Sequence, residues 1–446
     1  MRRLSVLAAS AVTLLSVSAG AAQPPAPAPG ARPAEAPLPP FDARAVVAEV
    51  RRVIAERYVL PERRPILDAA LAQSLAGGRY TTTDPAELAE RINADLDRAG
   101  HDRHLNFNFN PRQAAIAAAG NRPQPDTSAF ERQARAANHG ISELRVLPGN
   151  VRYMAYDGFV WTGPESAAAL ENAMRFLSGG DAVIIDLRRN GGGSPEAVQY
   201  IISHFLPAGR PLVTFYMNGS PSPDRLETLA ELPAGRMVGR PLYVLISGGT
   251  ASAAEEFTGH VGGYHLGELI GENTAGAGFR NDIVPIQGRF LLSVSVGRAV
   301  LASTGRDWEA VGLAPTIPTP IAGALDTAHA LALRRLATGA AGPDRARLEA
   351  MAEGVAARAE HRAPALPLDA YAGSYGERVV SVGEGRLWLR RGARAPLALV
   401  PLGGNLFTLE LQPEARLSFE VSGSAATAFA MGPAGQPPQG RFARNP

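Results

Sequence analysis

The amino-acid sequence predicts an α/β core that is preceded by a small helical domain and followed by a small β domain. Residues 182–187, apolar except for Asp186, and Leu242–Ile246 are apolar runs, which is typical of parallel strands buried on both faces. Helical patterns alternate with these runs, as in α/β layer structures. From residue 371 to 431, short apolar segments are instead separated by glycine turns, which predicts a separate sheet. The length of 446 residues also exceeds that of one ordinary domain.

The composition excludes several kinds of chemistry. The chain has no cysteine, so disulfides, thiolate catalysis and cysteine-ligated metals are excluded. All 44 basic residues are arginine, which stays protonated near neutral pH and is a poor general base. A serine nucleophile in this chain would therefore need a base other than lysine. The net charge of +2 provides no strong field toward nucleic acid or a membrane surface, so neither is expected as a partner.

The N-terminal residues have the pattern of an export signal. Arg2 and Arg3 precede an apolar run at 4–17 that is too short for a stable membrane span, and small residues follow at 19–21. This pattern predicts a signal peptide at 1–22 and a periplasmic or secreted protein without stable membrane insertion after cleavage. An uncleaved anchor is the alternative. Residues 23–40 are rich in proline and alanine, which predicts an extended linker.

Residues 41–110 are expected to form the N-terminal helical domain. Apolar residues recur there at helical spacing, as at Val46, Val47, Val50, Val53 and Ile54. Thr83 or Asp84 can cap a second helical pattern. The strict alternation of residues 104–110 predicts a strand and places His104 on its polar face.

The remaining chain is divided by its patterns into three parts. Residues 111–322 are expected to form the core, 323–364 a helical connector, and 365–446 the C-terminal β domain and tail. The core elements are predicted strands at Val151–Tyr156, 182–187, Leu242–Ile246 and 290–302, and predicted helices at 164–177, at 195–206 and from about residue 252.

Ser252 lies at the first of two corners that could carry chemistry. A buried strand ends at residue 246, Gly248 and Gly249 turn the chain, and a helix begins at the serine. Free backbone N–H groups and the positive end of the helix dipole would then lie near an oxyanion formed there. The alternative is that Ser252 only caps the helix.

The second corner is the run 186–193, where a buried strand ends at Asp186 and three glycines follow Asn190. Consecutive glycines let the backbone approach a ligand closely. Two such corners in one α/β domain favour a binding site, because ligands bind beyond the carboxyl ends of the strands. Among eight histidines, only His104 has an argument from pattern, although a structural histidine is the default.

These motifs, in this order, resemble the superfamily of C-terminal processing (tail-specific) serine peptidases. The resemblance rests on the His104 strand and on the runs 186–193, 250–257 and 308–312, and it covers about 41–322. It is strongest to the branch with tricorn-type proteases and interphotoreceptor retinoid-binding protein. This resemblance implies a ClpP/crotonase-like α/β core.

The superfamily uses either a Ser–Lys dyad or a Ser–His–Glu arrangement. The dyad requires a lysine, and Asn273 stands at its position here. The second arrangement matches residue by residue, with Ser252 as the nucleophile, His104 as the base and Glu309 as the acid that orients the base. The resemblance thus implies a serine triad without lysine.

The resemblance also implies an oxyanion hole made by the backbone N–H groups of Gly192 or Gly193 and of Ala253. The sequence departs from the family pattern at Thr316, where aspartate is usual. No stretch between residues 111 and 180 reads as a full PDZ domain, so a reader of substrate C-termini is not expected.

The implied function is an exported serine endopeptidase that hydrolyses bonds in peptides or unfolded proteins. No cofactor and no metal are expected. Two alternatives use the same fold: a binding module for an apolar ligand, and an esterase with the same triad.

Overall fold

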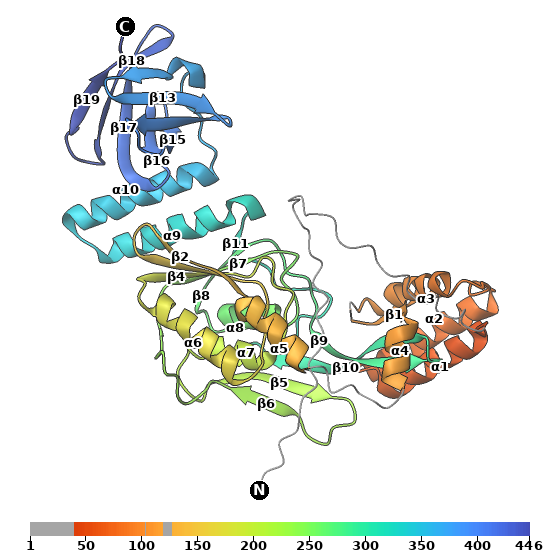
Figure 1. Cartoon of the computed structure of the whole chain (residues 1–446). Coiled ribbons are helices and arrows are strands. Elements are labelled where there is room, and N and C mark those ends of the chain that lie inside the picture. The colour runs from red at the N-terminus through yellow and green to blue at the C-terminus, as the bar shows by residue number, and fades with distance from the viewer. Residues whose placement is uncertain (1–39, 103, 119–126) are drawn as a thin grey trace. The chain divides into compact units, whose positions relative to one another are not determined.

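The computed structural model of the chain describes residues 40–102, 104–118 and 127–446 (Figure 1). They divide into two compact units. The first contains the described residues up to 130 together with 214–224 and 277–300, and the second contains 131–213, 225–276 and 301–446. The predicted signal peptide at 1–22 and nearly all of the predicted linker at 23–40 lie outside the described residues.

Helices open the first unit: α1 (Ala43–Arg57), α2 (Arg64–Ala76), α3 (Pro85–Gly100), α4 (Pro111–Ala118) and the start of α5 (Thr127–Ala136). The apolar residues predicted at helical spacing in α1 are all buried in one core with α2 and α3. Asp84 caps α3, because its carboxylate accepts the N–H of Ala86 at 2.8 Å. The predicted cap is therefore confirmed at Asp84.

Strands from distant parts of the sequence complete this core. β1 (Asn106–Phe109) and β9 (Phe279–Ile286) both pair antiparallel with β10 (Phe290–Leu301), and β5 (Pro211–Met217) and β6 (Asp224–Glu227) extend the sheet. Phe107 stacks on Phe290 with 5.0 Å between ring centroids. Leu292 and Val294 bury their side chains against the helices. The helices thus depend on strand residues far along the chain for their apolar contacts.

The second unit is built on a six-stranded sheet. Its order is β11 (Ile317–Pro318), β8 (Gly267–Gly271), β7 (Leu242–Ile246), β4 (Ala182–Asp186), β3 (Val151–Tyr156) and β2 (Ile141–Leu147). Neighbours are parallel from β3 to β11, and β2 is antiparallel to β3. Every residue of β4 and β7 is buried, so the prediction of two buried parallel strands is confirmed.

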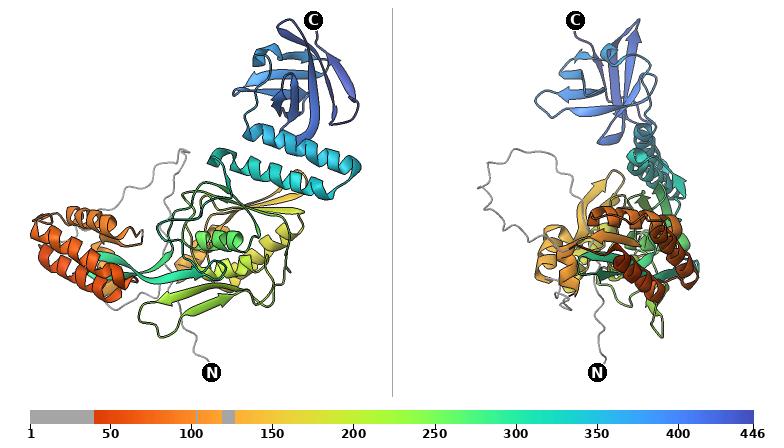
Figure 2. Two further views of the ribbon diagram at one scale, coloured as in Figure 1. Left: turned by 180° about the vertical axis from the view of Figure 1, so that it is seen from behind. Right: turned by 90° about the vertical axis from the view of Figure 1, so that its right-hand side faces the viewer.

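Helices cover both faces of this sheet (Figure 2). α6 (Pro164–Ser178), α7 (Pro195–Ile202) and α8 (Ala253–Gly263) lie on the side opposite α9 (Ala324–Gly339). α10 (Gly342–Ala359) packs on α9, and Leu333 and Met351 share a core with Ile184 and Leu245 of the sheet. Because β4 and β7 are parallel neighbours, their carboxyl ends meet at one edge of the sheet. Both glycine-rich turns begin at that edge.

The C-terminal part is an eight-stranded antiparallel sheet in which each strand pairs with the next. Its strands are β12 (Gly373–Tyr375), β13 (Arg378–Gly383), β14 (Arg386–Arg391), β15 (Leu397–Gly403), β16 (Leu406–Leu409), β17 (Gln412–Ser422), β18 (Ala425–Pro433) and β19 (Gly440–Ala443). It packs on α10, where Ala357 lies against Val400 and Leu402. The predicted fold class, with helices before an α/β core and a β part after it, is confirmed (Figure 1).

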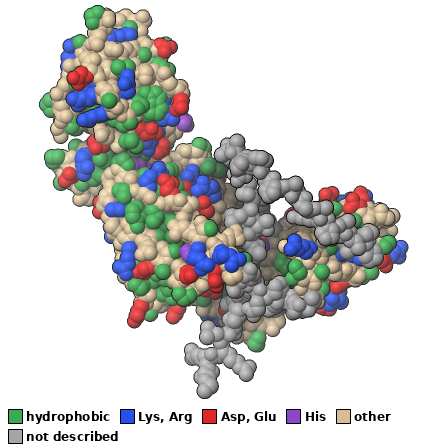
Figure 3. Space-filling model, viewed as in Figure 1, with side chains coloured by type: hydrophobic (Ala, Val, Ile, Leu, Met, Phe, Trp, Pro, Cys, Tyr) green, Lys and Arg blue, Asp and Glu red, His purple; other side chains and the backbone are tan. Residues whose placement is uncertain are grey.

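Two properties of the described residues bear on partners. None of their helices combines the length and the apolar character needed to cross a membrane. On the face shown in Figure 3, acidic and basic side chains are interspersed. This mixture agrees with the small net charge.

Candidate active site

The turn after β7 is fastened to the end of β4. The Thr250 hydroxyl donates to the carbonyl of Leu187 at 2.8 Å and accepts the N–H of Ser247 at 3.0 Å. The Ser247 hydroxyl donates to the carbonyl of Arg188 at 2.7 Å. Short polar side chains thus join the two corners that the sequence singled out.

Ser252 has an unusual backbone conformation immediately before α8. Its φ is 54° and its ψ is −119°, which correspond to the first central residue of a type II′ turn. Glycine dominates that position because a Cβ is strained there. An ordinary capping serine has an extended backbone. The conformation of Ser252 therefore differs from that of a simple helix cap.

The glycine turn after β4 lies directly against Ser252. A Cβ on Gly192 would come within 2.7 Å of the Ser252 Cβ, and one on Gly193 within 2.2 Å of the Phe159 carbonyl oxygen. Their φ angles are +107° and +143°, in the region that favours glycine. Both positions therefore require glycine, for space as well as for conformation.

The donors around Ser252 are not equivalent. The N–H of Gly192 donates to the side-chain oxygen of Asn190 at 2.9 Å. Within the described part of the chain, the N–H groups of Gly193 and Ala253 donate to no other group. Of the two glycines that the sequence offered for an oxyanion hole, Gly193 thus keeps its N–H available.

Asn190 supports this turn and was not chosen as a site residue from the sequence. Its side chain is completely buried, and its amide donates to the carbonyl of Tyr156 at 2.8 Å. Its own carbonyl accepts the N–H of Ala251 at 3.0 Å. An asparagine before glycines could equally serve an ordinary turn, so the sequence alone carried no signal for this role.

The buried side chain of Asp186 forms an ion pair with the half-buried Arg188 below the same edge. Burial would raise the pKa of Asp186, but the hydrogen bonds and charge of Arg188 outweigh burial and hold that pKa below its usual range. The Tyr153 hydroxyl donates to the same carboxylate at 2.8 Å. Asp186 is therefore a support of the turn, held in its charged form.

Glu309 lies in a loop of the second unit and is half-buried. It follows Trp308, whose side chain is buried, and precedes Ala310, which has a φ of 63°. The N–H of Ala310 donates to the carbonyl of Gly276 at 2.9 Å. Glu309 is thereby held beside the loop that contains residues 274–276.

His104 belongs to the first unit. Its N–H donates to the buried carboxylate of Asp102 at 2.8 Å, and its carbonyl accepts the Ser293 hydroxyl at 2.5 Å. Leu105 and Phe107 are buried beyond it, while His104 itself is half-buried. The second unit therefore brings together Ser252, Ala253 and both glycines and contains Glu309, whereas His104 is fixed by strand contacts of the first unit.

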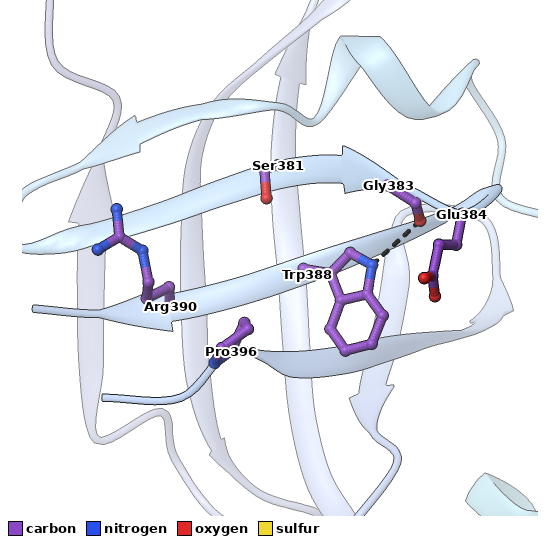
Figure 4. A pocket seen from close by; sticks show the side chains of 6 residues that line it. All are labelled: Ser381, Gly383, Glu384, Trp388, Arg390 and Pro396. Carbon is purple, nitrogen blue, oxygen red and sulfur yellow. Dashed lines mark hydrogen bonds between the residues drawn. The ribbon is translucent and has the colours of Figure 1, made fainter. Parts of the chain in front are cut away.

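One hollow of the second unit lies outside this corner. It measures about 350 Å³ on strands β13 to β15 and is lined by Ser381, Gly383, Glu384, Trp388, Arg390 and Pro396 (Figure 4). The Trp388 indole donates to the Gly383 carbonyl at 3.0 Å. This hollow contains none of the predicted site residues, so it is no guide to the chemistry of Ser252.

Two family models match the chain. The model described as peptidase family S41 matches residues 150–319, and the N-terminal domain of Peptidase_S41 in eukaryotic IRBP matches 42–137. A carboxyl-terminal-processing protease of Synechocystis sp. is 34% identical over 122 residues, 27% of this chain and 26% of that protein. The chloroplastic carboxyl-terminal-processing peptidase 2 of Arabidopsis thaliana is 27% identical over 204 residues, 44% of this chain and 38% of that protein. The chain thus spans well under half the length of these curated relatives.

Among solved structures, a photosystem II D1 C-terminal processing protease has a TM-score of 0.41 and 18% identity, over 63% of this chain and 94% of that one. The two family models cover both the segment with His104 and the segment with Ser252 and Glu309. The resemblance found in the sequence is confirmed, because residues 42–137 and 150–319 match models of peptidase family S41 and its N-terminal domain.

Proposed function

We propose that this chain is an exported serine endopeptidase in which Ser252 is the nucleophile, His104 the general base and Glu309 the acid that orients the base. The observation that carries the proposal is the strained backbone of Ser252 at a strand-to-helix turn. Such strain concentrates at functional sites. A nucleophile on a strained turn of this kind is also how other serine hydrolases expose their hydroxyl.

In this mechanism the imidazole of His104 accepts the Ser252 hydroxyl proton as the oxygen attacks the peptide carbonyl carbon. The imidazolium then donates that proton to the leaving amine, and water releases the acyl group by the same route. Glu309 stabilises the imidazolium and fixes its tautomer. The N–H groups of Gly193 and Ala253 receive the oxyanion, and each such donor contributes about 2.7–4 kcal/mol.

His260 and His265 are nearer to Ser252 in sequence but are poorer bases for it. At a rise of about 1.5 Å per residue, His260 lies roughly 12 Å along the α8 axis from Ser252. Proton transfer needs about 2.6–3.2 Å. His265 follows the end of that helix. The strand predicted at 104–110 is limited to β1 at Asn106–Phe109, so His104 lies in the turn before it. His104 remains the base that the family motif supports.

We propose peptides or unfolded proteins as substrates. The curated relatives are named for carboxyl-terminal processing. The described residues between 111 and 180 form α4 to α6 with β2 and β3, and both strands belong to the sheet of the second unit. This arrangement supports cleavage without a PDZ-type reader of substrate C-termini.

A binding module for an apolar ligand is the alternative from another class, because one matching model is an N-terminal domain found in eukaryotic IRBP. A fluorophosphonate probe separates the two. We expect covalent labelling of the wild type and none of Ser252→Ala, with casein hydrolysis lost in parallel. His104→Ala should lose roughly a thousandfold or more in turnover, and Glu309→Gln less. His265→Ala, at an exposed residue, is the matched control and should remain active. A wild type that neither labels nor cleaves would contradict the proposal.

The periplasmic or secreted location is part of the proposal and rests on the arginines and apolar run of residues 1–22. N-terminal sequencing of the native protein should find a start near Ala22 or Gln23. A cytoplasmic product that retains Met1 would contradict export but leave the catalytic assignment untouched.

A further inference from the structure

A buried carboxylate lies beneath the nucleophile turn. Glu255, the third residue of α8, is completely buried. One of its oxygens accepts the N–H of Ser252 at 2.9 Å. The other accepts the Thr274 hydroxyl at 2.6 Å and the N–H of Gly276 at 2.7 Å. Both oxygens of one carboxylate are thus occupied by donors from two separate segments.

The same contacts continue to the loop of Glu309. The Thr274 hydroxyl oxygen also accepts the N–H of Leu313 at 2.7 Å, and the Gly276 carbonyl accepts the N–H of Ala310 at 2.9 Å. A Cβ on Gly276 would come within 3.0 Å of the Ala310 backbone, so the two loops are in close contact. Glu255 is therefore the common anchor of the segments that hold Ser252 and Glu309.

An ordinary capping box accounts for only part of this arrangement. In a capping box, the glutamate at the third helical position accepts the N–H of the capping residue, as Glu255 does here. Ser252, however, lacks the extended backbone of a cap, and Glu255 also accepts hydrogen bonds from Thr274 and Gly276 of another loop. Burying a charge costs several kcal/mol unless hydrogen bonds compensate it. Capping of the helix alone therefore does not account for a completely buried carboxylate at this position.

We propose that Glu255 is a positioning residue for the nucleophile, which holds the N–H of Ser252 in the strained turn and fixes the 274–276 loop against the loop of Glu309. It does not touch substrate and transfers no proton. This inference rests on the proposed peptidase function. Misplacement of a reacting group by about 1 Å can cost roughly a hundredfold in rate, so loss of the anchor should lower reactivity.

Glu255→Gln tests the proposal with little change in shape. An amide has only one acceptor oxygen, so the NH₂ group of the glutamine must face either the N–H of Ser252 or the donors of the 274–276 loop. In both cases two hydrogen-bond donors face each other. We expect kcat, and the rate of fluorophosphonate labelling, to fall about 10–100-fold while KM changes less than about threefold. Glu256→Gln is the matched control, since Glu256 is the next residue of α8 and is also buried. Its rates should stay within about threefold of the wild type.

A second pair of variants covers the case in which Glu255→Gln fails to fold. Thr274→Val keeps the shape of a buried side chain but removes the hydroxyl that joins Glu255 to Leu313, whereas Thr274→Ser retains it. Labelling should slow about 3–10-fold in the valine variant and recover in the serine variant. Equal labelling rates in folded Thr274→Val and Thr274→Ser would overturn the proposal, as would wild-type kcat in Glu255→Gln. A wild type that does not label overturns the peptidase function itself, so the two failures are distinguishable.

Discussion

Replacing Ser252 with glycine should stabilise the fold while abolishing hydrolysis. The backbone of Ser252, at φ 54° and ψ −119°, lies in a region that glycine adopts freely and other residues rarely do. A side chain held there costs about 1–3 kcal/mol. Glycine removes this cost but adds about 0.4–1 kcal/mol of freedom to the unfolded chain. The free energy of unfolding should therefore rise by about 0.5–2 kcal/mol.

Ser252→Ala is the matched control for this prediction. Alanine removes the hydroxyl as glycine does, but it keeps the Cβ and the strain. Both variants should be inactive on casein, and only glycine should be more stable than the wild type. If the serine were simply a cap for α8, alanine would instead cost about 0.5–2 kcal/mol and glycine only a few tenths.

Guanidinium denaturation followed by tryptophan fluorescence measures the difference. All three tryptophans lie in the second unit, at 161, 308 and 388, so their emission reports on the part that contains Ser252. An increased midpoint at an unchanged m-value would identify a change in stability alone. A glycine variant no more stable than the wild type, together with a destabilised alanine variant, would refute the strain argument. Residual hydrolysis in either variant would refute Ser252 as the nucleophile.

Two further predictions concern other positions. Gly193→Ala should lower the melting temperature and the rate of casein hydrolysis, because the new Cβ would lie 2.2 Å from the Phe159 carbonyl oxygen. Gly191→Ala is the control and should behave as the wild type, because no atom lies within 4 Å of its Cβ. Equal effects of the two substitutions would contradict the steric argument. Burial lowers the pKa of His329 to about 4 from its usual 6.5. Between those pH values the unfolded chain binds a proton that the folded chain does not, so stability should fall as the pH drops from about 6.5 to 4, by an amount of the order of 3 kcal/mol. His329→Gln should flatten this dependence in denaturation curves, and an unchanged slope would contradict it.

The outline of the fold follows from local pattern in the sequence. The apolar runs of β4 and β7 mark buried strands, and the glycines after them mark the corners where Gly193 and Ser252 lie. The backbone strain at Ser252 could not be predicted from the sequence, because no local sequence signal indicates that a serine has a positive φ. The α/β class was predictable because periodicity and turn residues act over a few positions.

Contacts between distant segments were not predictable in the same way. A glutamate at the third position of a helix suggests a capping box, and nothing local reveals that Thr274 and Gly276 also donate to Glu255. The long strand near residue 290 was expected, but not its antiparallel register with β1, because register depends on partners rather than on the strand itself.

The first unit is built from segments that are far apart in the sequence, and this affects its folding during synthesis. A ribosome that adds roughly 5–20 residues per second delivers α1 to α3 about 10–40 s before β10. Until then, Phe107 and the apolar face of the helices lack Phe290 and Leu292 as neighbours. Throughout that interval the nascent chain presents a hydrophobic surface that chaperones can bind. A fragment that ends near residue 110 would keep this surface permanently, and would aggregate where the whole chain folds.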